Sequence, residues 1–178
     1  MLILVSDWCF KLHPLILPSP NLFNMYSILL ATHSLVRWLV LISLLFAIYK
    51  AYRGWLMRKM FTDFDNSSTK FAVSMVHLQF TIGICLYIIS PITTYFLHNF
   101  KTAVHERQIR FFGMEHVTMM VIAVALITAG SSIAKRKKTD REKFKAIAIW
   151  FTIGLLLILA SIPWQFSPLT SRPYFRPF

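Results

Sequence analysis

Charged side chains are scarce in this sequence. They make up 15% of its 178 residues, and the hydrophobic fraction reaches 56%. A soluble domain carries about 25% charged residues. A chain of this length forms one domain with one core, which cannot hide that much apolar surface from water. We therefore expect an integral membrane protein.

Cysteine, glycine and acidic residues are few as well. The two cysteines, Cys9 and Cys85, exclude a disulfide framework and a thiolate metal cage. The 5 glycines and 8 prolines exclude collagen-like and low-complexity classes. Only 7 acidic residues oppose 19 basic ones, so the net charge is +12. Such an excess is typical of nucleic-acid binding in a soluble protein, but the placement of these charges along the chain favours a membrane explanation.

Four long apolar stretches dominate the sequence. They lie at about 27–49, 71–90, 111–134 and 146–166. Each reaches the roughly 20 residues needed to cross a bilayer core of about 30 Å, and none alternates as a barrel strand does. Pro91 follows the second stretch and Pro163 lies near the end of the fourth, where proline ends a helix. The predicted fold class is all-α, an integral membrane up-down four-helix bundle.

The basic residues predict how the bundle is oriented. Twelve lie in the connections between spans one and two and between spans three and four: Lys50, Arg53, Arg58, Lys59, Lys70, Lys135, Arg136, Lys137, Lys138, Arg141, Lys143 and Lys145. Five lie beyond the opposite ends of the spans: Lys101, Arg107, Arg110, Arg172 and Arg176. Basic loops face the cytoplasm, so both termini are expected outside. The KRKK run then serves topology and contact with anionic lipid rather than nucleic acid.

The two ends of the chain differ from the spans. Residues 1–24 have no basic n-region and no A-x-A site, and their prolines at 14, 18 and 20 disfavour a helix, so they make a poor signal peptide. We expect them to be an upstream extension of the gene, with translation from Met25, or a flexible outer segment. Residues 25–166 form the transmembrane domain, and the proline-rich residues 167–178 are expected to be an extended outer tail.

Five ionisable residues lie inside the spans: His33, Arg37, His77, Glu115 and His116. Such residues are costly in a bilayer, which makes them candidates for a functional site. At a rise of 1.5 Å per residue, His33 and His116 lie about 9 and 8 Å below the outer surface. His77 lies about 9 Å from the inner surface instead.

The matched depth of His33 and His116 predicts one haem between spans one and three. Neutral imidazole ligates haem iron, and the absence of C-x-x-C-H excludes a covalent c-type haem. We expect His33 and His116 to be the axial ligands of a haem b that lies edge-on near the outer face. The alternative is that the two histidines only form hydrogen bonds between helices.

The arginines and His77 have expected roles around this pair. Arg107 and Arg110, at the outer mouth of span three, are expected to bind the haem propionates. Arg37 is expected to pair with Glu115 inside the bundle, with tuning of the haem potential or binding of a quinone oxygen as alternatives. His77 is expected to form a hydrogen bond to a neighbouring helix. The alternative for His77 is a second site, where it would ligate a haem shared across a dimer or contact a quinone.

Four segments of the sequence resemble a known family. They are THSLVRW at 32–38, HLQ at 77–79 with Gly83, MEHVTMM at 114–120, and IPW at 162–164. Together they are similar to a family of small four-helix bacterial membrane proteins usually labelled cytochrome b, over residues 25–166. The resemblance implies haem, electron transfer and the bacterial inner membrane.

Three functions follow from these observations. The first is a haem b electron carrier, which would be an electron-transfer subunit rather than a stand-alone enzyme. Its expected partners are a quinol or respiratory-chain subunits. The sequence leaves open whether the chain forms a homodimer. The second is a non-catalytic scaffold or assembly subunit of a respiratory complex. The third, a transporter built on Arg37 and Glu115, is disfavoured because glycine and proline rarely interrupt the spans.

Overall fold

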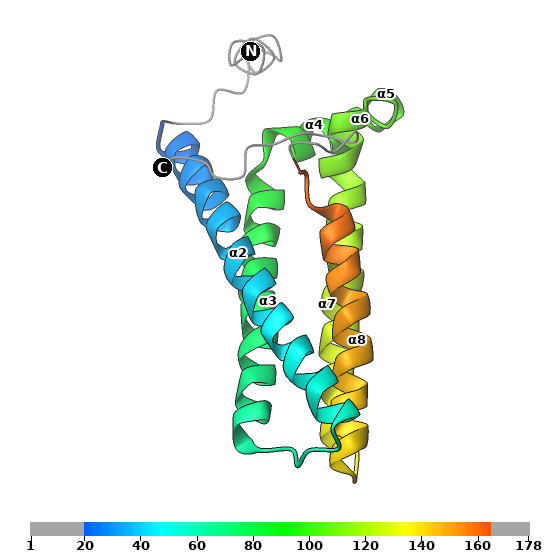
Figure 1. Ribbon diagram of the computed structural model, residues 1–178. Helices are drawn as coiled ribbons and strands as arrows, with labels where there is room; N and C mark the ends of the chain where they lie inside the picture. The colour runs from blue at the N-terminus through cyan, green and yellow to red at the C-terminus, as the bar shows by residue number, and fades with distance from the viewer. Residues whose placement is uncertain (1–19, 165–178) are drawn as a thin grey trace.

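The computed structural model describes residues 20–164, and their side chains from residue 25 onward. Helices account for all regular structure in this part of the chain. The four long ones are α2 (Pro20–Leu56), α3 (Asp63–Ile89), α7 (His116–Arg136) and α8 (Asp140–Ser161). They run up and down along one another, as Figure 1 shows. The all-α fold class is confirmed.

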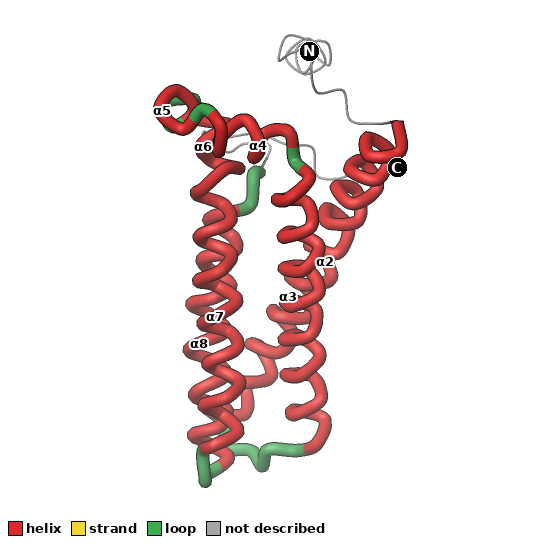
Figure 2. The backbone as a smooth tube through the Cα atoms, turned by 180° about the vertical axis from the view of Figure 1, so that it is seen from behind, coloured by secondary structure: helices red, strands yellow, loops and turns green. Residues whose placement is uncertain are grey.

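Four shorter elements connect α3 to α7. They are α4 (Pro91–His98), α5 (Phe100–Ala103), α6 (Arg107–Arg110) and the π-helix η1 (Phe111–Glu115). Helices α4, α5 and α6 cover one end of the bundle, at the top of Figures 1 and 2. We call this end the cap end (residues 91–110). The opposite end, with the loops at 57–62 and 137–139, is the basic end.

The four long helical stretches are long and apolar enough to cross a membrane. Even α8, with 22 residues, is about 33 Å long at 1.5 Å per residue, which exceeds the bilayer core. Large apolar side chains such as Ile42, Ile88 and Leu156 point away from the protein. Exposing these apolar side chains to water would cost free energy, so these faces of the helices face lipid. The chain is a multi-pass membrane protein.

Local sequence signals explain where the helices begin and end. Thr62 and Asp65 form a capping box at the start of α3, and Thr139 accepts a hydrogen bond from the backbone of Glu142 at the start of α8. Pro91 occupies the first turn of α4, and Pro163 follows the last residue of α8 by two positions. The predicted proline stops are therefore confirmed.

Small residues let α7 and α8 pack closely. Gly130 lies against the Trp150 side chain, and a Cβ added at Gly154 would come within 2.5 Å of Ile127 Cγ1. Helix α2 packs on α3 and α8, and its side chain Leu44 is fully buried with Phe151 of α8. Helix α2 therefore packs mainly on α3 and α8, and α7 packs mainly on α8 and α3.

The expectations for the chain ends fall mostly outside the described residues. Residues 1–19 and the tail 167–178 are among those not described. Helix α2 begins at Pro20, a residue that we expected to disfavour a helix. Proline suits the first turn because its missing N–H is not needed there, so that expectation was wrong for Pro20.

Candidate functional site

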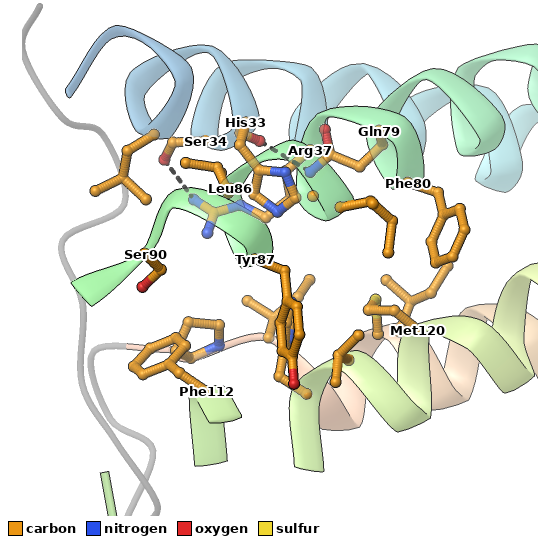
Figure 3. A pocket seen from close by; sticks show the side chains of 18 of the residues that line it. His33, Ser34, Arg37, Gln79, Phe80, Leu86, Tyr87, Ser90, Phe112 and Met120 are labelled. Carbon is orange, nitrogen blue, oxygen red and sulfur yellow. Dashed lines mark hydrogen bonds between the residues drawn. The ribbon is translucent and has the colours of Figure 1, made fainter. Parts of the chain in front are cut away.

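A cavity of about 200 Å³ lies within the bundle toward the cap end, between α2, α3 and α7. Its wall is largely apolar, with a small set of polar side chains, and Figure 3 shows it from close by. The polar and aromatic residues that matter below are His33, Arg37, Gln79, Tyr87, Ser90, Thr93, Phe112 and His116. The cavity therefore unites the two histidines that the sequence paired by depth.

His116 is held by a bond to the end of α8. Its Nδ1 lies 2.9 Å from the backbone carbonyl oxygen of Ser161. A carbonyl can only accept, so Nδ1 carries the proton and Nε2 keeps its lone pair. Phe111 and Phe112 flank the ring, with centroids 5.7 and 6.4 Å from that of His116. This arrangement orients the imidazole and leaves one nitrogen able to bind a metal.

His33 is fitted against α3. The amide of Gln79 donates a hydrogen bond of 2.9 Å to the His33 backbone carbonyl. Gly83 leaves room for the ring, because a Cβ there would lie 3.2 Å from His33 Cε1. Nδ1 of His33 is buried and has no hydrogen-bond partner among the described residues. A buried polar atom without a partner is unusual and indicates a role for the ring beyond packing.

The π-helix η1 sets the direction of His116. Its widened turn brings residues five apart together, and the Nε of Arg110 lies 2.6 Å from the Glu115 carboxylate. The hydroxyl of Tyr87 donates a bond of 2.9 Å to the carbonyl of Gly113 within the turn. Sequence reasoning assumed a regular helix through this segment and missed η1. The polar side chain of Tyr87, which faces this turn from α3, was the available sign of an irregular backbone there.

The expected pair of Arg37 with Glu115 is wrong. Glu115 binds Arg110, because the π-turn places their side chains together. Arg37 lines the cavity, with Nη2 3.4 Å from the Ser34 hydroxyl and the guanidinium 5.4 Å from the centre of the Trp38 ring. Helical side chains tilt toward the N-terminus. Arg37 therefore reaches toward the cap end, not deeper into the bundle, as Figure 3 shows.

Arg107 and Arg110 do not line the cavity. Arg107 begins α6 and is exposed, and Arg110 is held by Glu115 and by the carbonyl of Val104 at 3.1 Å. The expectation that these two arginines bind the haem propionates stays a prediction. Arg37 is the arginine that the structure brings to the histidines.

His77 lies apart from the cavity. Its Nε2 is 2.9 Å from the Thr128 hydroxyl of α7. The predicted hydrogen bond to a neighbouring helix is confirmed. The second site at His77 stays a prediction.

Sequence reasoning also missed two hydroxyl residues of the cavity wall, Ser90 and Thr93, both buried beside the start of α4. The signal was present in the spacing. Gly83 and Tyr87 lie four residues apart on one face of α3, and Ser90 follows directly after the end of that helix. That face is the one that meets His33.

Comparison with protein-family models, with curated proteins and with solved structures finds no match to this chain. Among the described residues there is also no group of three or more histidine, cysteine or acidic side chains that could hold a metal ion. The resemblance to the cytochrome b family therefore stays a prediction, and the site has to be interpreted from its own geometry.

Proposed function

We propose that the chain is a membrane electron carrier that binds one haem b, with His33 and His116 as axial ligands. One observation carries this proposal. The two imidazoles come from different helices and line the same largely apolar cavity, and the Ser161 bond leaves Nε2 of His116 free to ligate. Two histidines are the simplest axial pair for a b-type haem, whose iron supplies a one-electron couple when bound.

The residues around the pair fit this group. Phe80, Phe112 and Met120 offer the aromatic and soft side chains that pack against a porphyrin. The volume of about 200 Å³ is below the roughly 300 Å³ of the smallest typical ligand pockets. A bound haem would therefore widen this cavity, with side chains of α2, α3 and α7 moving outward.

The polar wall of the cavity suits the propionates of such a haem. Arg37 provides a cation, and Ser90 and Thr93 provide buried hydroxyls. Carboxylates bind best where a charged donor meets further hydrogen-bond donors. In this proposal Arg37 takes the place that we first expected for Arg107 and Arg110.

We also propose how the chain is oriented in the membrane and which kinds of partner it meets. The basic end faces the cytoplasm and the cap end faces outward, in a bacterial inner membrane with both termini outside, as the distribution of basic residues favours. A quinol or another respiratory-chain subunit supplies or takes the electron. A homodimer is compatible with the lipid-facing surfaces.

Haem content of purified variants tests the ligands. We expect one haem per chain in the wild type expressed with haem available, and loss of the six-coordinate low-spin spectrum in both His33→Ala and His116→Ala. His77→Ala is the matched control, since His77 lies outside the cavity, and it should keep its haem.

Two results would reject this assignment. Haem that survives His33→Ala and disappears with His77→Ala would place the iron elsewhere. Wild-type protein that stays colourless with haem available would favour the alternative proposal, a non-catalytic scaffold or assembly subunit of a respiratory complex.

A further inference from the structure

A second cavity, of about 320 Å³, lies at the basic end of the bundle. It opens between the first turns of α3 and α8 and the last turn of α7. The residues used below are Asn66, Thr69, Ser131, Lys135 and Lys143, with Asp63 at the rim. Unlike the cavity of the two histidines, its wall is mainly polar, so it is suited to a different class of ligand.

Ser131 contributes a hydroxyl-bearing side chain to the wall of this cavity. The residue is only 6% exposed and lines the cavity. The neighbouring buried hydroxyl, that of Thr69, is already used by the carbonyl of Asp65 at 2.8 Å. Ser131 therefore offers a hydroxyl at the cavity wall to a ligand that enters it.

Lys135 makes the cavity attractive to an anion. It is an exposed cation in the last turn of α7. Lys143 is held in place by Asp140 at 3.3 Å and by the Phe61 ring, 5.4 Å from its Nζ. The buried carboxylate of Asp65 is balanced by Lys50 at 3.0 Å, which leaves the exposed Asp63 as the acidic group of the wall. Further basic residues at 137 and 138 strengthen the positive potential.

We propose that this cavity binds a phosphate group, carried by an anionic phospholipid or free in solution. Lysine binds phosphate as a point charge, and a serine hydroxyl and an amide complete the donors for its oxygens. The cavity lies where transmembrane helices end, at the level of lipid headgroups, and the cytoplasmic leaflet is rich in anionic lipid. The proposal does not depend on haem binding.

Native mass spectrometry of the full chain in detergent, with phosphatidylglycerol in competition with phosphatidylcholine, tests the lipid source. A titration with inorganic phosphate, followed by thermal unfolding, tests the free anion. Lys135→Gln should weaken binding about tenfold, because a charge-assisted bond is lost, and Ser131→Ala by a smaller factor. The matched control is Lys138→Gln, which removes the same charge from the nearby loop but does not line the cavity.

The outcomes separate the sources and the alternatives. Preference for phosphatidylglycerol that is lost in Lys135→Gln and kept in Lys138→Gln supports a headgroup site. Stabilisation by inorganic phosphate with the same variant pattern, and no lipid preference, supports a site for free phosphate. Equal losses in Lys135→Gln and Lys138→Gln would show diffuse attraction and overturn the proposal. Absence of both effects in the wild type would overturn it as well.

Discussion

At the scale of single residues, the Ser161 carbonyl decides which nitrogen of His116 carries the proton. The bond of 2.9 Å to Nδ1 fixes the tautomer that leaves Nε2 available. His33 lacks such a partner on Nδ1 within the described chain, and its position comes from Gln79 and Gly83 instead. The two histidines thus occupy one cavity but are held in different ways.

Gly83 offers a test of the His33 position. Gly83→Leu should displace the imidazole, because even a Cβ would lie 3.2 Å from Cε1. We expect this variant to lose most of its haem while its helices still form. Cys85→Leu is the control, since Cys85 is exposed on the same helix. The measurement is haem per chain after purification, and full occupancy in Gly83→Leu would contradict the account.

Arg37 gives a second test at this scale. A cation beside a haem favours the reduced form, because reduction removes one positive charge from the iron. Arg37→Gln should therefore lower the midpoint potential by tens of millivolts in a redox titration. Arg107→Gln removes the same charge from an exposed site outside the cavity and should leave the potential nearly unchanged. Equal shifts in both variants would refute a special role for Arg37.

At the scale of elements, the π-turn η1 links α3 to the direction of His116. A π-turn leaves backbone groups that a regular helix would satisfy, and the hydroxyl of Tyr87 binds the carbonyl of Gly113 in this turn. Arg110 and Glu115 close the same turn from the other side. The turn that directly precedes His116 is thus fixed by its neighbours.

Tyr87→Phe removes that bond and keeps the ring. We expect the free energy of unfolding to fall by about 1 kcal/mol, because a partly buried carbonyl loses its donor. Tyr49→Phe is the control, since Tyr49 is exposed on α2. Thermal or denaturant unfolding in detergent measures both. Unchanged stability in Tyr87→Phe would show that the π-turn does not need this contact.

The elements also show what could be predicted from the sequence. The existence of four spans, the proline stops and the proximity of His33 and His116 depend on local composition and on the helical rise, and these were foreseen. The helices extend beyond the predicted spans, most of all α2, which runs to Leu56 rather than to about residue 49. The turn η1 and the Arg110–Glu115 pair depend on one extra residue in a helical turn. The reach of Arg37 toward the cap end depends on the direction of its side chain. Hydrophobic periodicity does not report either property.

At the scale of the whole molecule, the two ends differ in character. The cap end carries the short helices α4, α5 and α6 (Figure 2). The cavity of the histidines lies toward this end, and the second cavity lies at the basic end. An electron carrier with this arrangement would exchange electrons near its cap end. Its orientation in the membrane decides on which side of the membrane that exchange occurs.

Labelling with an impermeant thiol reagent measures this orientation. In a background without Cys9 and Cys85, a cysteine at Asn99 should react in intact cells, and a cysteine at Thr139 should react only after lysis. The reason is the excess of basic residues at the end that contains Thr139. The reverse pattern would contradict the proposed topology.

The central claim is that this bundle holds one haem between two histidines. The reduced-minus-oxidised absorption spectrum of the purified wild-type chain, expressed with haem available, tests it most directly. We expect a low-spin six-coordinate b-type spectrum with one haem per chain. A colourless protein, or haem bound in a five-coordinate state that is insensitive to loss of His33 or His116, would contradict it.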